Sequence, residues 1–239
     1  MHHGITETYK LRLTDFNCYG HITPTALLDI FQDMATQHAA LLGIGLNDLR
    51  QKGYIWAVVR QKVEVLQNPA IHQRVQVRTW PHTLNRMGLK RDYEMTAEDG
   101  TVIAKGTSEW VVLDAENKQF VNAADVYTGP TDFCEDRMFE GRLRKVKDFE
   151  SEKPRLVLVP QFTDMDSNMH VNNARYFNFI ANALENTPDK QIRWFQIDYR
   201  KELMVGQPAS LNVMEDELGT HVNGLDPEGN VIFNCLLGY

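Results

Sequence analysis

Residues 164–180 read DMDSNMHVNNARYFNFI, and residues 15–31 read DFNCYGHITPTALLDIF. When the two runs are aligned, Asp15 meets Asp164 and His21 meets His170, and each polar run leads into an apolar segment. A second pair of stretches, EDGTVIAKGTSEW from Glu98 and PEGNVIFNCLLGY from Pro227, also aligns without a gap. An internal repeat of this kind predicts two halves built on one plan.

Each half is expected to begin with a helix. In the first, Thr23 is a predicted N-cap, Pro24 stands at the first helical position, and Gly43 ends the helix after Leu41 and Leu42. In the second, Asn172 or Asn173 is the expected cap of a helix that runs to Pro188. Both segments are apolar over more than one face, which is typical of a helix buried against a sheet.

Strand patterns follow each helix. Alternation of period two occurs in 54–66 and 74–80, and the 92–114 stretch reads as a hairpin that turns at Asp99-Gly100. In the second half, the stretches 194–203, 209–216 and 230–239 have the same character. Between the halves, residues 120–155 lose periodicity and gain charge, as a linker does.

Composition narrows the class of protein. The 239 residues are 43% hydrophobic, which is enough for a substantial core, and the formal charge of −7 argues against nucleic acid as a partner. Cys18, Cys134 and Cys235 are far apart and show no CxxC spacing, so neither a disulfide framework nor a zinc site is expected. No apolar signal segment or membrane span is found, and a cytoplasmic location fits best.

The chain resembles the acyl-[acyl carrier protein] thioesterases of plants and bacteria from about Tyr9 to Tyr239. The motifs that carry the resemblance are IWAVVRQKVEVLQNPAIHQRVQVRTWP, GLKRDYEM, GTSEWVVLD, DMDSNMHVNNARYFNFI and DYRKEL. The resemblance implies an α+β tandem (double) hotdog, in which each half is an antiparallel sheet wrapped around one long buried helix. We expect an acyl-chain-binding hotdog at 1–130, a linker at 131–155 and a catalytic hotdog at 156–239.

The same resemblance implies a catalytic group of Asp166, Asn168, His170 and Glu202, with Glu202 on the following strand. Many plant members have a cysteine directly after this glutamate, whereas this chain has Leu203, so a thiol mechanism is not expected. The first half has Asn17 and Tyr19 where the second has Asp166 and Asn168, and only His21 matches. The first half is therefore expected to have no catalytic activity.

These residue types suit thioester hydrolysis. A thiolate leaves easily at neutral pH, so the demanding step is addition to the carbonyl, which needs a base for water or an attacking carboxylate, and donors for the oxyanion. Asp166 and Glu202 can supply carboxylates, Asn168 an orienting amide, and His170 a donor or proton carrier. Neither a metal nor a cofactor is expected, since one His with scattered carboxylates lacks the ligands of a catalytic zinc.

Further residues have two interpretations each. Asn172 and Asn173 are either helix caps or part of an oxyanion site, and Trp56 either packs in the sheet or lines the acyl slot. Four basic residues belong either to a solvated linker or to a docking patch for the acidic acyl carrier protein: Arg142, Arg144, Lys145 and Lys147. Glu202 could instead pair with Arg200 or Lys201, and Cys18 is expected to be a small buried residue.

The sequence favours hydrolysis of fatty acyl-[acyl carrier protein] to free fatty acid. An acyl-CoA thioesterase would share the same site. A hotdog dehydratase of 3-hydroxyacyl thioesters would not need Asn168 and Glu202, and a non-catalytic acyl-binding module would not need the polar group at 166–170. Acyl chain length and oligomeric state, including a homodimer, are left open.

Overall fold

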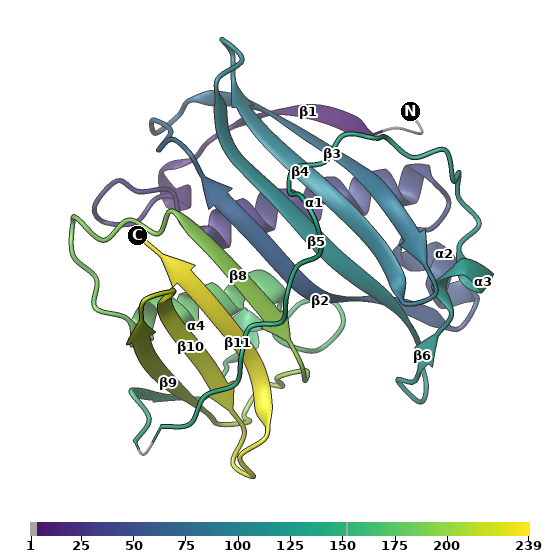
Figure 1. Cartoon of the computed structure of the whole chain (residues 1–239). Coiled ribbons are helices and arrows are strands. Elements are labelled where there is room, and N and C mark those ends of the chain that lie inside the picture. The colour runs from purple at the N-terminus through teal and green to yellow at the C-terminus, as the bar shows by residue number, and fades with distance from the viewer. Residues whose placement is uncertain (1–3, 152) are drawn as a thin grey trace. The chain divides into compact units, whose positions relative to one another are not determined.

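The chain forms two compact units. The structure, a computed structural model, describes residues 4–151 and 153–239. The first unit consists of Met1–Thr14 and Asp29–Arg142, and the second of Asp15–Leu28 and Leu143–Tyr239. Each contains an antiparallel sheet and a helix packed on it, so the α+β class is as predicted (Figure 1).

The sheet of the first unit has the strand order β1-β3-β4-β5-β2, and a short β6 pairs with β5. Gly100 has a left-handed φ of +85° in the tight turn between β4 and β5, where the sequence predicted a hairpin. The strand bounds are β1 Ile5–Lys10, β2 Tyr54–Val65, β3 Arg74–Asn85, β4 Gly88–Ala97, β5 Val102–Asp114 and β6 Phe120–Val121.

Helix α1 spans Pro24–Leu41, and its residues up to Leu28 belong to the second unit. Thr23 caps it as predicted, because its Oγ1 accepts a hydrogen bond from the Ala26 N–H at 3.1 Å. In the first unit, the Phe31 ring stacks on Tyr93 of β4, with 4.7 Å between ring centroids. Leu41, the last residue of the helix, is exposed, so the apolar character of the segment does not mean that it is buried along its whole length. Two shorter helices, α2 (Leu46–Gln51) and α3 (Ala123–Val126), complete this unit.

The sheet of the second unit has the order β8-β11-β10-β9-β7. Its strands are β7 Leu156–Leu158, β8 Trp194–Tyr199, β9 Ala209–Asp216, β10 Gly219–Leu225 and β11 Val231–Gly238. A 3-10 turn at Asn173–Arg175 leads into α4, Tyr176–Ala183, whose Phe177 ring lies 4.2 Å from Phe195 of β8. The helix ends before the predicted Pro188, because Leu184 has extended backbone.

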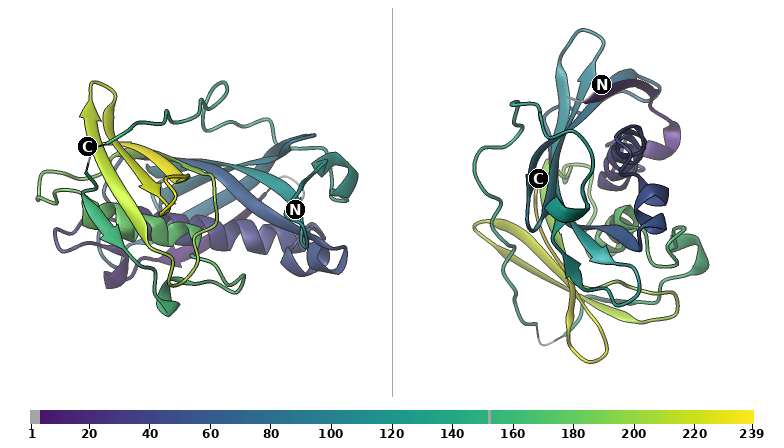
Figure 2. Two further views of the ribbon diagram at one scale, coloured as in Figure 1. Left: turned by 90° about the horizontal axis from the view of Figure 1, so that it is seen from below. Right: turned by 90° about the vertical axis from the view of Figure 1, so that its right-hand side faces the viewer.

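The linker lies along the sheets rather than in solvent. In the first unit, the Asp136 carbonyl accepts a hydrogen bond from Trp80 of β3, and the Met138 N–H donates to Asp92 of β4. Figure 2 shows this segment on the opposite face of the sheet from α1. The linker was predicted from its irregular sequence, but its attachment was not.

In the second unit, a row of buried polar side chains holds the linker. Four of these side chains lie opposite one another on neighbouring strands: Asp198 on β8, Asn234 on β11, Asn223 on β10 and Asn212 on β9. Asp198 accepts a hydrogen bond from the Val146 N–H, Asn234 donates to Asp148, and Asn223 donates to the Phe149 carbonyl. The linker thus supplies hydrogen-bond partners to three buried polar side chains of this row, Asp198, Asn234 and Asn223. Within the described residues, no helix is both long and apolar enough to cross a membrane.

Candidate functional site

The two aligned polar runs fold into the same loop. Each starts with a 3-10 turn, Leu13–Asp15 or Phe162–Asp164, and closes with an isolated bridge, Phe16 to Ile22 or Met165 to Val171. The backbone hydrogen bonds also repeat, with Asn17 N–H to His21 O at 2.9 Å and Asp166 N–H to His170 O at 3.0 Å. The internal repeat predicted from sequence is therefore present in three dimensions.

In the second loop, His170 lies between two carboxylates. Its Nδ1 is 4.0 Å from Asp166 Oδ1, and its Nε2 is 4.0 Å from Glu202 Oε1. These distances are longer than hydrogen bonds, although catalytic hydrogen bonds commonly shorten when substrate binds. The structure therefore brings the three ionisable residues of the predicted group together.

Asn168 is held against Asp166. Its N–H donates to Asp166 Oδ1 at 2.7 Å, and its Nδ2 donates to Oδ2 at 3.4 Å. These two bonds hold the Asp166 carboxylate within the turn that leads to His170. The Asp166 N–H closes the same turn by donating to the His170 carbonyl. Asn168 thus orients the carboxylate as well as presenting its own amide.

Glu202 lies in the loop after β8 and not on a strand, so its predicted placement was wrong. The reason is that β8 ends at Tyr199, and the chain then turns so that the Leu203 carbonyl accepts a hydrogen bond from the Val171 N–H at 2.8 Å. Arg200 and Lys201, its alternative partners, bind Asp148 and Asp226 instead. This turn places Glu202 beside the loop that carries His170.

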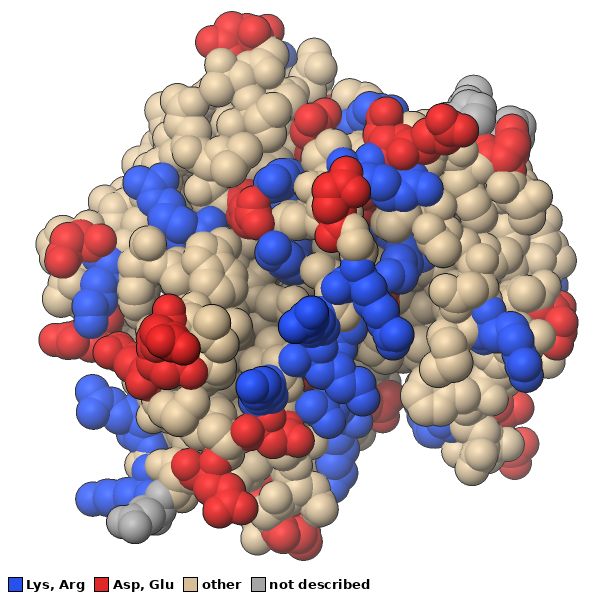
Figure 3. Space-filling model, in the orientation of Figure 1, with Lys and Arg blue, Asp and Glu red and all other residues tan. Residues whose placement is uncertain are grey.

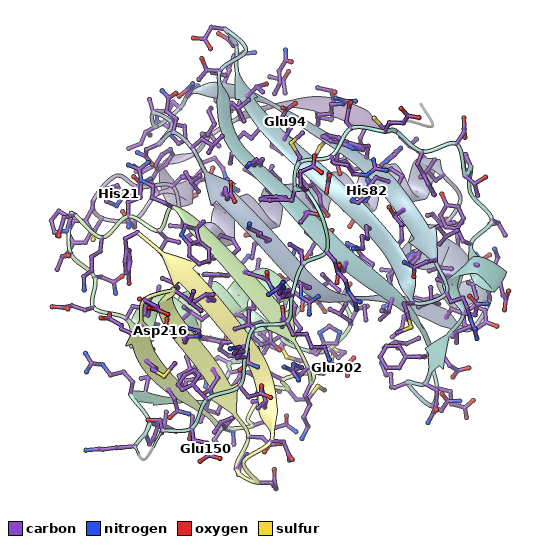
Figure 4. The ribbon with its side chains drawn as sticks, viewed as in Figure 1. His21, His82, Glu94, Glu150, Glu202 and Asp216 are labelled. Atoms are coloured by element: carbon purple, nitrogen blue, oxygen red, sulfur yellow. The ribbon has the colours of Figure 1, made fainter. Side chains whose placement is uncertain are left out.

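The first loop carries a different set of partners. Asn17 Oδ1 accepts hydrogen bonds from the N–H groups of Tyr19 and His21, and the Tyr19 hydroxyl donates to the Asn186 carbonyl. Figure 4 shows His21 and Glu202 well apart within the second unit. His21 is therefore not part of the group around His170.

Asn172 and Asn173 begin the helical segment. Asn172 Oδ1 accepts a hydrogen bond from the Ala174 N–H at 2.9 Å, so this residue is a cap. The Asn173 carbonyl accepts a hydrogen bond from the Tyr199 hydroxyl at 3.0 Å. Both residues fix the direction in which the chain leaves His170.

The other predicted binding residues lie in separate places. Trp56 Nε1 donates to the Ile44 carbonyl at 2.9 Å, and its ring packs in apolar clusters of the first unit. Arg142, Arg144, Lys145 and Lys147 are exposed, while Val146 between them is buried. On the face shown in Figure 3, Lys and Arg side chains gather along the course of this linker.

Sequence reasoning missed Tyr176, which looked like one apolar residue of a buried helix. Its ring lies edge-on to Tyr199 and Phe233, at centroid distances of 5.3 and 5.4 Å. Burial raises the pKa of the Tyr176 phenol, and the nearby charges of Glu202 and Asp166 raise it further, while a hydrogen bond with the Leu203 backbone lowers it. The phenol is therefore neutral.

The cysteines differ in exposure. Cys18 is exposed, so the expectation that it is buried was wrong: it lies in the turn of the first loop, whose residues 17–19 are all exposed. Cys235 lies in the core, where burial raises the pKa of its thiol well above the ordinary value. Among residues 4–151 and 153–239, no group of three His, Cys, Asp or Glu side chains is arranged to hold a metal ion.

Comparison with known proteins gives consistent matches. The model of the acyl-ACP thioesterase N-terminal domain matches residues 3–130, and that of the C-terminal domain matches residues 148–226. The palmitoyl-acyl carrier protein thioesterase of Gossypium hirsutum is 28% identical over 82% of this chain and 51% of its own length. The oleoyl-acyl carrier protein thioesterase of Coriandrum sativum is 26% identical over 91% of this chain and 65% of its own length. Both relatives are named as chloroplastic, and this chain spans about half to two thirds of their length.

Solved structures show the same fold. A crystal structure of an acyl-ACP thioesterase from Bacteroides thetaiotaomicron superposes with a TM-score of 0.86 at 22% identity, over 98% of this chain and 96% of that one. The double hotdog architecture is therefore confirmed, with a shorter helix in the second half than the sequence predicted. With one family model covering more than half of the chain and another covering most of the remainder, the protein belongs to the acyl-ACP thioesterase family.

Proposed function

We propose that this chain hydrolyses fatty acyl thioesters of acyl carrier protein to free fatty acid and carrier thiol. The observation that carries the proposal is the placement of His170 between the carboxylates of Asp166 and Glu202. Two carboxylates on either side of one imidazole suit the activation of water and the transfer of its proton.

In the proposed reaction, water adds to the thioester carbonyl carbon, and the carbon–sulfur bond then breaks. Asp166 or Glu202 takes the proton from water, with His170 as donor or carrier, and the thiol sulfur leaves as thiolate. Asn168 orients Asp166, and the N–H groups that follow Asn172 and Asn173 are candidate donors to the oxyanion. Leu203 offers no thiol at the position next to Glu202.

We further propose that the hotdog at 1–130 binds the acyl chain, with Trp56 among its lining residues, and that the hotdog at 156–239 carries the chemistry. The support is the difference between the loops: the first has the Asn17 amide where the second has the Asp166 carboxylate, although both side chains accept a hydrogen bond from the residue two positions later. A hotdog without catalytic residues can use its interior to bind an apolar acyl chain.

The basic linker is the proposed docking site for the carrier protein. Arg144, Lys145 and Lys147 flank Val146, whose N–H donates to buried Asp198, so the backbone of this segment is fixed while the charges face solvent. Fixed charges lose little side-chain and loop entropy when an acidic partner binds. Arg142 extends the same row.

The proposed location is the cytoplasm, from the three scattered cysteines, and no nucleic acid partner is proposed for a chain of net charge −7. Light scattering of the purified protein would distinguish a monomer from a homodimer.

The test is release of thiol from acyl carrier protein and from CoA that carry the same acyl chains. The proposal expects turnover of both, with the higher kcat/KM on the carrier protein. Higher kcat/KM on CoA would favour an acyl-CoA thioesterase, and water loss from a 3-hydroxyacyl thioester without thiol release would identify a dehydratase. Binding with no turnover of any thioester would contradict the proposal.

A further inference from the structure

Polar side chains gather inside the first unit, on the face of the sheet that α1 covers (Figure 2). Arg91 of β4 lies directly opposite Ser108 of β5, and Ser108 lies directly opposite Gln61 of β2. Neighbouring positions on these strands are apolar, as Val63 and Met95 show. The polar cluster consists of six residues that are at most 4% exposed: His38 of α1, Gln61, Thr79, Arg91, Tyr93 and Ser108.

Arg91 is the charged member of the polar cluster. Its Nη1 lies 3.0 Å from His38 Nδ1 and donates to Thr79 Oγ1 at 3.2 Å. A guanidinium only donates, so His38 Nδ1 is the acceptor and the imidazole is neutral. In the part of the chain that the structure describes, Arg91 makes no ion pair with a carboxylate, and its Nη2 and Nε make no hydrogen bond. Asp92, the next residue, faces the linker and accepts a hydrogen bond from the Met138 N–H.

A buried guanidinium without an acidic partner is costly, because its charge has lost its hydration. Burial accordingly lowers the pKa of Arg91, although the group stays protonated at neutral pH. Arg60 gives the contrast, since it is also buried but pairs with Glu109 at 2.9 Å. Glu109 also binds Lys90, the strand neighbour of Arg91, so this pair lies on the opposite face of the sheet. The structure thus leaves two donor nitrogens of Arg91 for an acceptor from outside the chain.

We propose that Arg91 binds an oxygen atom on the acyl chain, so that the preferred substrates are acyl thioesters whose chain carries a hydroxyl or a terminal carboxylate. This inference rests on the proposed function, because the acyl chain is the ligand proposed for the hotdog at 1–130. An unsubstituted chain brings only methylene and methyl groups to the guanidinium and leaves its donors unpaired. A site built to hydrogen-bond an oxygen discriminates strongly against an analogue that lacks it.

The first experiment measures thiol release by the wild-type protein from acyl carrier protein that carries chains of one length. The chains are unsubstituted, hydroxylated at successive positions, or ended by a carboxylate. We expect kcat/KM for at least one oxygen-bearing chain to exceed that for the unsubstituted chain roughly 10- to 100-fold, because a hydrogen bond to a charged group contributes on that order. The hydroxyl and carboxylate chains distinguish a neutral from an anionic acceptor.

The second experiment repeats the comparison with Arg91→Met, which replaces the guanidinium with an apolar side chain. The ratio of the two kcat/KM values, oxygen-bearing over unsubstituted, should fall to about 1. Arg60→Met is the matched control, since it removes a similarly buried guanidinium from the other face of the same sheet. Its ratio should equal that of the wild type. Thermal melts show whether both variants are folded.

Two results would overturn the proposal. One is a wild-type protein that hydrolyses no oxygen-bearing chain faster than the unsubstituted chain, and the other is a folded Arg91→Met variant that keeps the wild-type ratio. If Arg91→Met does not fold, the wild-type comparison still decides. Turnover of no thioester at all counts against the proposed function instead. Calorimetry with the corresponding free fatty acids then tests Arg91 without turnover, and equal Kd values for oxygen-bearing and unsubstituted acids would contradict its assigned role.

Discussion

Gly20 and Met169 occupy the same position in the two copies of the loop, and both have left-handed backbone, with φ of +76° and +67°. Each N–H closes the same turn, onto Asn17 O at 3.0 Å and Asp166 O at 3.1 Å. Glycine adopts this conformation without steric cost, whereas methionine does not. The loop that carries His170 is thus the strained copy.

Met169→Gly should therefore stabilise the protein by about 1 kcal/mol, because relief of the strain exceeds the entropy that glycine adds to the unfolded chain. Gly20→Ala should destabilise it by a similar amount, since a Cβ at Gly20 meets nothing within 4 Å and only strain changes. Urea unfolding of both variants measures the two effects. Equal signs for the two changes would contradict the assignment of strain.

The two histidines should differ in function. His170→Ala should lower kcat by several orders of magnitude, because a unit that lacks one member retains little beyond binding. His21→Ala lacks the carboxylate partners and should change stability by about 1–2 kcal/mol, with kcat near wild type. The measurement is kcat of the two variants, with thermal melts to show that both are folded to the same extent. A dead His21→Ala enzyme beside an active His170→Ala enzyme would place the chemistry in the other loop.

Reversal of the linker charges should affect only the carrier substrate. Changing Arg142, Arg144, Lys145 and Lys147 to Glu should raise KM for acyl carrier protein substrates severalfold at low salt, with little effect on a small thioester, and salt should reduce the difference. A control variant with the same change in net charge replaces other exposed basic residues of the first unit: Lys10, Lys52, Arg74 and Arg86. If both variants raise KM equally, the linker is not a specific docking site.

The cysteines should react in the order of their exposure. A thiol reagent at pH 8 should modify exposed Cys18 first and Cys235 only on unfolding, because that thiol is buried and its pKa is raised. Modification of Cys18, and replacement of all three cysteines, should leave most of kcat. A covalent acyl adduct on any of them during turnover would show that a thiol takes part.

The attachment of the linker can be tested at Asn223. Asn223→Ala removes hydrogen bonds to the Phe149 carbonyl and Asn212, and should destabilise the protein by about 1–3 kcal/mol. It should also speed tryptic cleavage at the basic residues 142–147. Asn230→Ala, at an exposed turn, serves as control. Unchanged cleavage in a destabilised Asn223→Ala protein would mean that the linker is held by other contacts.

The sequence predicted those features that depend on local pattern. The alternation of apolar and polar residues predicted both ends of β9 and the approximate bounds of most other strands. The helix cap predicted at Thr23 and the turn predicted at Gly100 are both present. The repeat identified both loops, because a tight turn needs particular residues at fixed spacing.

Features that depend on long-range contacts were not predicted. β8 ends at Tyr199, although polar alternation continues to Glu202, because the chain turns there to bond with Val171. Asn234 lies in a predicted strand, whereas β10, which carries Asn223, was not predicted at all. The hydrogen bonds of both side chains to the linker depend on its path, which the sequence did not predict. Tyr176 had no signal at all, since its position beside Leu203 depends on how α4 packs.

The polar row across β8, β11, β10 and β9 also limits how the chain can associate with itself. Sheets stack face to face when the side chains of two such faces interdigitate about 10 Å apart. On this part of the second unit the space is taken by residues 146–149, and another copy could enter only if their hydrogen bonds to Asp198, Asn234 and Asn223 were broken. The linker therefore protects this face against sheet-on-sheet stacking.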